Sequence, residues 1–123
     1  MLGYVTIGTN DMARAAAFYD ELLGIVGATR FMDMDRFKGW TKDGAITGAL
    51  AVAIPHDEKP ATVGNGVMPA ISAASKAQVD EIYRKALELG GTDEGPPGPR
   101  GDGFYAGYFR DLDGNKLNAF FIG

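Results

Sequence analysis

The sequence contains no cysteine, which excludes disulfide bonds, thiolate nucleophiles and cysteine-based zinc sites. Histidine is almost as scarce, since the only one is His56 in the polar stretch IPHDEKP. We expect His56 to be a solvated loop residue, with a role as general base as the less favoured alternative. The chain therefore has no cysteine and only one histidine that could act as a metal ligand or as a nucleophile.

Clustered basic charge and long apolar runs are also missing. The chain has 12 Lys and Arg, scattered among 16 Asp and Glu, and a formal net charge of −4. This composition disfavours nucleic acid as a partner, because phosphate contacts need clustered cations. No segment approaches the roughly 18 apolar residues of a membrane helix, and the N-terminus MLGYVTIGTND does not resemble a signal peptide. We expect a cytoplasmic protein with no membrane partner.

The chain has enough residues, and enough apolar ones, for one domain with a core. It is 123 residues long and 46% hydrophobic, which argues against disorder. We predict a single domain over 1–123, with a first module at about 1–55 and a second at about 66–123. The stretch PHDEKPATVGNG between them is rich in Pro, Gly and charge and is typical of a linker.

A strand-helix pattern occurs twice. YVTIG (4–8) and VMPAIS (67–72) are strand-like, and each precedes a segment with apolar residues at helical spacing. When the two segments are aligned, Tyr4 corresponds to Met68 and Tyr19 to Tyr83. The chain therefore contains an internal repeat.

Both predicted helices have start and stop signals. Asn10 or Asp11 can cap the first, and Ser75 begins a capping box in the second. Gly24 and Gly90 fit the left-handed residue that follows a last helical turn. We expect the helices to lie between these residues.

About three strand-like runs follow each helix. The first three are ATRFMDMD, RFKGWTKD and ITGALAVAI, and the second three are a short piece near Thr92, FYAGYFR and NKLNAFFI. A helix followed by antiparallel strands indicates an α+β unit whose helix covers one sheet face. We predict two βαβββ modules in tandem, whose uncovered faces could enclose a cavity.

Alternation along the strands predicts which residues face that cavity. Val5 and Ile7 should pack on the first helix, which places Tyr4 on the other face. In the last strand, Asn118 and Phe120 share one side. An amide and a large aromatic ring on the same side are suited to lining part of a ligand cavity.

Four more residues have two interpretations each. Tyr105 and Tyr108 lie on opposite faces of FYAGYFR, and alternation does not decide which face meets the cavity. Arg100 in PPGPRGDGFY is either an anchor for a ligand carboxylate or phosphate or a solvated turn residue. Trp40 lines the cavity or lies at a dimer contact.

The stretch RDLDGNKLNAFFIG has some features of a calcium-binding loop. Counted from Asp111, the positions that need Gly and Glu in an EF-hand hold Lys116 and Ile122, so the calcium interpretation fails. Asp113-Gly114 between apolar runs instead predicts a hairpin turn.

Three stretches together resemble the vicinal oxygen chelate superfamily, which includes glyoxalase I, bleomycin-resistance proteins and extradiol dioxygenases. They are VTIGTNDMARAAAFYDELLG, GNGVMPAISAASKAQVDEIYRKALELGGTDEGPPGPR and YAGYFRDLDGNKLNAFF. The resemblance implies paired βαβββ modules closing a cup-shaped mixed sheet, usually in a homodimer. It also implies a divalent metal in the cup, held by His, Gln or Glu from four strands.

The ligand positions of that family fall on unsuitable residues here. Three of them fall on Tyr4, Met68 and Asn118, and the fourth lies in ITGALAVAI, which has no carboxylate or imidazole. Zn²⁺, Ni²⁺ and Mn²⁺ prefer imidazole or carboxylate in such a site. We therefore expect no metal and no other cofactor.

The sequence thus favours a metal-free family member that binds a small, partly apolar molecule in its cup. The alternative is a lyase, isomerase or dioxygenase-like enzyme with a divergent or metal-free active site, and no catalytic residue is assigned. The residues expected to bind the ligand are Tyr4, Trp40, Met68, Arg100, Tyr105, Asn118 and Phe120.

Overall fold

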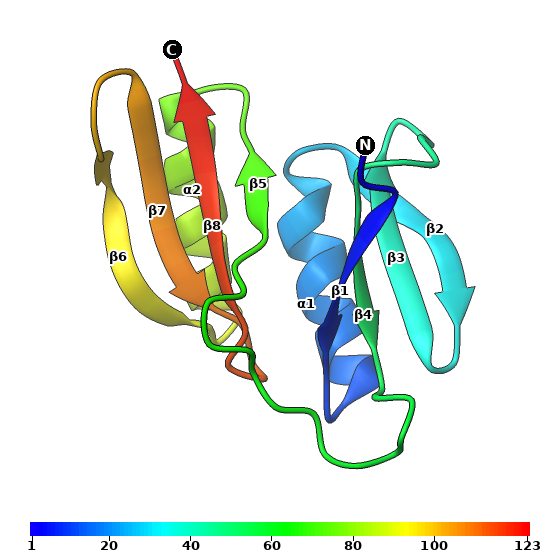
Figure 1. The fold of residues 1–123 in the computed structure, drawn as a ribbon. Coiled ribbons are helices and arrows are strands. Elements are labelled where there is room, and N and C mark those ends of the chain that lie inside the picture. Colours follow the sequence, from blue (N-terminus) through cyan, green and yellow to red (C-terminus); the bar gives the residue numbers. More distant parts are fainter. The chain divides into compact units, whose positions relative to one another are not determined.

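The structure, a computed structural model, describes residues 1–123 and contains two compact units. Unit 1 is Met1–Gly64 and unit 2 is Asn65–Gly123. In both units a helix lies against a four-stranded sheet (Figure 1). Neither helix has the length and apolar character needed to cross a membrane.

The order of elements in both units is strand, helix and three strands. Unit 1 has β1 (Tyr4–Gly8), α1 (Met12–Gly24), β2 (Ala28–Met34), β3 (Phe37–Lys42) and β4 (Ala49–Ala53). Unit 2 has β5 (Ala70–Ser72), α2 (Lys76–Glu88), β6 (Thr92–Pro99), β7 (Phe104–Arg110) and β8 (Lys116–Ile122). The two βαβββ units confirm the predicted α+β class.

The two sheets also share one topology. Their strand orders are β1-β4-β3-β2 and β5-β8-β7-β6. The first strand of each unit pairs in parallel with the last, and the remaining pairs are antiparallel. The last strand is therefore an inner strand of each sheet.

Helix α1 begins where a side chain satisfies its free N–H groups. The Asp11 carboxylate accepts a hydrogen bond from the Arg14 backbone N–H at 3.1 Å, so Asp11 is the cap. The prediction for Gly24 was wrong. The helix includes Gly24, Ile25 is its C-cap, and the left-handed residue is Gly27, with φ 80°.

Helix α2 has the predicted ends. The Ser75 hydroxyl accepts from the Gln78 backbone N–H at 3.1 Å, and Gly90 has φ 99°. The Gln78 side chain in turn accepts from the Ala74 N–H at 2.7 Å. Both signals read from the sequence are confirmed.

Two strands differ from their predicted bounds. The run expected over 67–72 is a strand only over Ala70–Ser72, because Pro69 has no N–H to donate to a ladder. The short piece expected near Thr92 is an eight-residue strand. It holds three prolines, which are tolerated because β6 is an edge strand with register shifts around Gly95.

Register shows which sheet face each helix covers. In unit 1, Val52 pairs with Ile7 and Lys38 on the α1 side, and Trp40 packs there against Tyr19 with ring centroids 5.7 Å apart. The large buried side chains on this side form the core of the unit, each worth about 1.5–3 kcal/mol on burial. They include Trp40, Tyr19, Leu22 and Val52.

The opposite side of each sheet is here called its helix-free face. In unit 1 this face carries Tyr4, Thr6, Phe37, Ala51 and Ala53, which share a side through the pairing of β1 and β3 with β4. In unit 2 it carries the residues that pair with Asn118 and Phe120 of β8. These are Ala70, Ser72, Ala106 and Tyr108.

Candidate functional site

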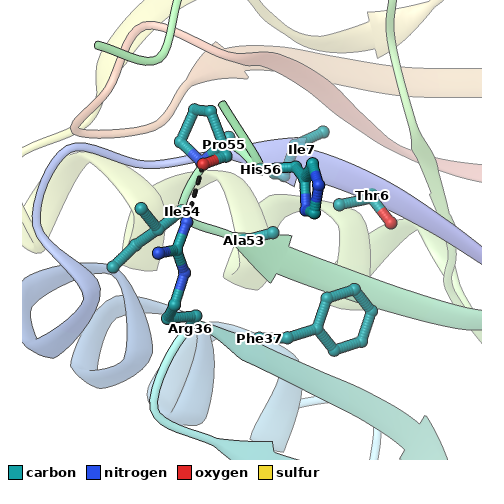
Figure 2. Close-up of a pocket in the computed structure, with 9 residues that line it drawn as sticks. Thr6, Ile7, Arg36, Phe37, Ala53, Ile54, Pro55 and His56 are labelled. Carbon is teal, nitrogen blue, oxygen red and sulfur yellow. Dashed lines mark hydrogen bonds between the residues drawn. The ribbon is translucent and has the colours of Figure 1, made fainter. Parts of the chain in front are cut away.

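A pocket of about 440 Å³ opens at the end of β4 in unit 1 (Figure 2). Its lining is mostly apolar, and none of its side chains is a carboxylate. Such composition suits the binding of a small apolar group. The lining residues are Thr6, Ile7, Gly8, Arg36, Phe37, Ala53, Ile54, Pro55 and His56.

A fixed return of the chain brings the segment after β4 alongside β1. The Asn10 side chain donates to the Ala61 carbonyl at 3.2 Å and accepts from the Ala61 N–H at 2.7 Å. Gly8 permits this approach, since a Cβ at that position would lie 3.0 Å from the Ala61 Cβ. Hydrogen bonds at Ala61 therefore hold the C-terminal end of the segment that follows β4 and includes His56.

Arg36 ties the same segment from the other side of the pocket. Its guanidinium donates to the Glu58 carboxylate at 2.7 Å and to the Pro55 carbonyl at 2.9 Å, a contact that Figure 2 shows as a dashed line. The Pro55 carbonyl also accepts from the Glu58 backbone N–H at 3.0 Å. These bonds close a small turn at the mouth of the pocket.

Tyr4 lies on the helix-free face beside the pocket. Its side chain is 54% exposed, and its ring meets the Phe37 ring edge-on at a centroid distance of 5.6 Å. Phe37 is itself a lining residue. Tyr4 thus extends the aromatic surface of the pocket outward.

Trp40 lies on the other side of the sheet. It is 1% exposed, and its indole N–H donates to the Asp20 carboxylate at 2.8 Å. Its ring packs against Tyr19 of α1. The structure therefore separates Trp40 from Tyr4 and Phe37, and places it in the core.

Asn118 occupies the middle of the helix-free face of unit 2. It is 2% exposed, and its side-chain carbonyl oxygen has no hydrogen-bond partner. Tyr108 and Ala70 flank it in the sheet, and Phe120 lies two residues on with its ring stacked at 5.6 Å on Phe104. A buried amide oxygen without a partner is costly.

Arg100 is held within its own loop next to this face. Its guanidinium donates to the carbonyl oxygens of Pro96 at 2.5 Å and Pro99 at 3.3 Å, and it lies 5.5 Å from the centre of the Tyr108 ring. Lys116 lies 5.8 Å from the centre of the same ring. Arg100 thus stabilises its own loop by hydrogen bonds and contacts an aromatic ring. Its role in ligand binding remains a prediction.

Tyr105 faces α2. Its hydroxyl donates to the Asp80 carboxylate at 2.7 Å, and the Lys76 ammonium lies 5.8 Å from its ring centre. The hydrogen bond to Asp80, together with burial, raises the pKa of Tyr105 above its ordinary value. Tyr108, not Tyr105, shares a face with Asn118.

The turn between β7 and β8 is structural, as the hairpin interpretation predicts. One Asp111 carboxylate oxygen accepts from the backbone N–H groups of Asp113 and Asn115, both at 2.9 Å, and the other accepts from the Asn115 amide at 3.0 Å. Gly114 provides the left-handed conformation, with φ 88°. The Asp111 carboxylate is engaged within its own turn.

The side chains present do not suit the divalent metal of the family that the sequence resembles. No group of three or more His, Asp or Glu side chains is placed to hold a metal ion anywhere in the chain. On the helix-free face of unit 1, β4 presents Ala49, Ala51 and Ala53, which have no donor atom. A phenol, a thioether and an amide at Tyr4, Met68 and Asn118 are poor ligands for such a metal.

Several residues at the site escaped the sequence analysis. These are Arg36, Phe37 and Ile54, which line the pocket. Alternation from Tyr4 through the sheet could have found Phe37 if the register had been known. No sequence pattern linked Arg36 to the segment after β4.

Comparisons with known proteins agree with this architecture. The family model of the Glyoxalase/Bleomycin resistance protein/Dioxygenase superfamily matches residues 1–119. A search of curated proteins found no match. The match to the family model extends over most of both units.

Solved structures of similar proteins show the same fold. A glyoxalase/bleomycin resistance protein from Albidiferax ferrireducens T118 is 35% identical with a TM-score of 0.88, over 98% of this chain and 97% of that one. A superfamily member from Sphaerobacter thermophilus DSM 20745 is 25% identical with a TM-score of 0.70, over 98% and 95%. A family enzyme from Burkholderia phytofirmans PsJN, 16% identical with a TM-score of 0.78 over 98% of each chain, shares the fold. The chain therefore belongs to the Glyoxalase/Bleomycin resistance protein/Dioxygenase superfamily.

Proposed function

We propose that this protein binds a small, partly apolar molecule, and that the pocket at the end of β4 holds the apolar part. The observation that carries the proposal is the pocket of about 440 Å³ with its mostly apolar lining. The poor fit of the side chains to a metal supports binding over the metal chemistry of the family.

The size of the apolar contribution follows from the area covered. Apolar ligand surface buried in the pocket contributes about 25 cal/mol per Å², and only the part of this gain that exceeds the cost of lost translational and rotational freedom appears as affinity. Tighter binding would need polar contacts. The lining residues with polar side chains are Thr6, Arg36 and His56.

We further propose that the helix-free face of each unit, taken by itself, offers contacts to a small molecule. Tyr4 and Phe37 form an exposed aromatic edge in unit 1, and the unpartnered amide oxygen of Asn118 can accept a hydrogen bond in unit 2. Phe120 and the exposed side chain of Met68 complete this set. Trp40 and Tyr105 are left out, because both side chains pack on helices.

The test uses the neutral fluorescent probe N-phenyl-1-naphthylamine. We expect saturable binding to the folded protein, and a loss of about tenfold in affinity for Ala53→Leu, whose larger side chain fills the pocket. Ala17→Leu, an exposed position on α1, is the matched control and should bind as the wild type does. Equal binding by all three proteins, or no saturable binding, would contradict the proposal.

A further inference from the structure

We infer that the ligand of the pocket carries an anionic group, and that Arg36 receives this group in exchange for the carboxylate of Glu58. The inference rests on the proposed function and names the chemical class of the ligand. Arg36 is the only lining residue with a permanent charge. A molecule with an apolar body and a carboxylate, sulfonate or phosphate at one end would match both parts of the pocket.

The geometry of Arg36 suits this exchange. One terminal nitrogen of its guanidinium donates to the Pro55 carbonyl at 2.9 Å, which fixes the plane of the group at the pocket mouth. The other donates to Glu58 at 2.7 Å. A guanidinium binds any carboxylate or similar anion in the same way, so the Glu58 carboxylate occupies the position that a ligand anion would take.

The backbone of Glu58 presents its side chain to Arg36. Glu58 has φ 63°, a left-handed conformation that non-glycine residues rarely adopt, and its N–H bonds the Pro55 carbonyl. A residue kept in such a conformation beside a pocket points to a functional arrangement. The turn therefore places a carboxylate of the chain itself at the pocket mouth.

The ion pair is weak enough to be exchanged. The Arg36 side chain is 46% exposed and that of Glu58 74%, and exposed pairs of this kind add little to stability. Glu58 can move into solvent without leaving a buried charge. An anion whose apolar part is buried in the pocket would be held at Arg36 by more contacts than Glu58 has.

Two fluorescent probes separate the anion from the apolar body. The first, 8-anilino-1-naphthalenesulfonate, has the anilinonaphthalene body of N-phenyl-1-naphthylamine and adds a sulfonate. We expect Arg36→Gln to weaken binding of the sulfonate about tenfold, since a charged hydrogen bond is lost. We expect Glu58→Gln to strengthen it about threefold to tenfold, since the competing charge is removed. The affinity for the neutral probe should change by less than about twofold in Glu58→Gln, and Arg36→Gln should weaken binding of the neutral probe less than binding of the sulfonate.

The outcomes distinguish this inference from the proposed function. If the neutral probe binds and Ala53→Leu blocks it, but neither Arg36→Gln nor Glu58→Gln changes sulfonate binding, the exchange is wrong and the apolar pocket stands. If sulfonate affinity changes in all three variants as expected, the apolar pocket and the anion exchange are both supported. If neither probe binds, both are wrong. Lys38→Gln, on β3 two residues after Arg36 and outside the pocket, is the control for loss of a positive charge, and it should leave both affinities unchanged.

Discussion

Asp20 of α1 connects two side chains from neighbouring strands, Arg30 and Trp40. Its carboxylate accepts from Arg30 at 2.9 and 2.7 Å and from the buried indole of Trp40 at 2.8 Å. Partial burial raises the pKa of Asp20, but the hydrogen bonds from Arg30 and Trp40 and the charge of Arg30 outweigh this, so the pKa is lowered from its ordinary value. The carboxylate thus holds β2 and β3 to the helix as an anion.

Removing this carboxylate should destabilise unit 1. Asp20→Ala leaves the Trp40 N–H buried without a partner, and we expect the free energy of unfolding to fall by about 2 kcal/mol. Trp40 is the only tryptophan, so its fluorescence in a urea titration reports on this site. Glu21→Ala, at the exposed neighbouring position, should change the value by less than about 0.5 kcal/mol. A loss for Asp20→Ala no larger than this would contradict the role assigned to Asp20.

Asn118 should behave in the opposite way. Its amide oxygen is buried without a partner, so Asn118→Leu, whose side chain has the same branching, should raise the free energy of unfolding by about 1 kcal/mol. Far-UV circular dichroism during urea unfolding measures this. Ser72→Ala, an exposed position on the same face, serves as the comparison. A strong destabilisation by leucine would mean that the amide is needed by the fold itself.

At the scale of the elements, local signals predicted the strands and helices and the faces they bury. Alternation placed Val5 and Ile7 toward α1 and Asn118 with Phe120 on the other face, as the register confirms. Local signals were wrong where backbone hydrogen bonding decided the outcome. Pro69 shortened β5, and the position of β6 at the sheet edge allowed a strand through prolines that would have interrupted an inner strand.

The contact between α2 and β6 predicts an alkaline loss of stability. The Tyr83 hydroxyl donates to the Asp93 carboxylate at 2.7 Å, and burial followed by this hydrogen bond raises the pKa of Tyr83 from 10.0 to about 12. A raised pKa stabilises the fold below the ordinary value, and this stabilisation is lost as pH rises from 10.0 to about 12.

The measurement is the free energy of unfolding of the wild type and of Tyr83→Phe over that pH range. The wild type should lose more stability than the variant, because phenylalanine has no proton to lose. Tyr4 is exposed and lies far from Asp93 in sequence. Tyr4→Phe should therefore lose as much free energy of unfolding over this pH range as the wild type does. Parallel curves for wild type and Tyr83→Phe would show that the contact has no such linkage.

At the scale of the whole molecule, the two repeats have the same strand order and differ in the side chains that their inner strands carry on the helix-free faces. Thr6 pairs with Ala51 in unit 1, and its repeat partner Ala70 pairs with Asn118 in unit 2. Small residues on β4 leave room for the pocket, whereas an amide and a ring occupy β8. The sequence revealed the repeat and the helix-free faces. It did not reveal the pocket mouth, because the contact of Arg36 with Glu58 depends on how the chain returns after β4.

The unsuitable donor set also leads to a prediction for the purified protein. Untagged protein prepared without chelator should hold less than about a tenth of an equivalent of any transition metal, since phenol, thioether and amide groups bind such ions weakly. Elemental mass spectrometry measures this directly. A metal-dependent enzyme would instead be favoured by close to one equivalent of metal per chain, together with chelator-sensitive turnover of a hemithioacetal or a catechol.

The parallel pairing of the first and last strand in each unit has a consequence for how the chain folds. Tyr4 pairs with Ala49, and Ala70 pairs with Asn118, so both ladders join residues far apart in sequence. The β2–β3 and β7–β8 hairpins form from neighbours and can appear early, while β1 and β5 must wait for the last strand of their unit. Such distant closure slows folding. On the ribosome, the first unit therefore has no complete sheet until its β4 has emerged.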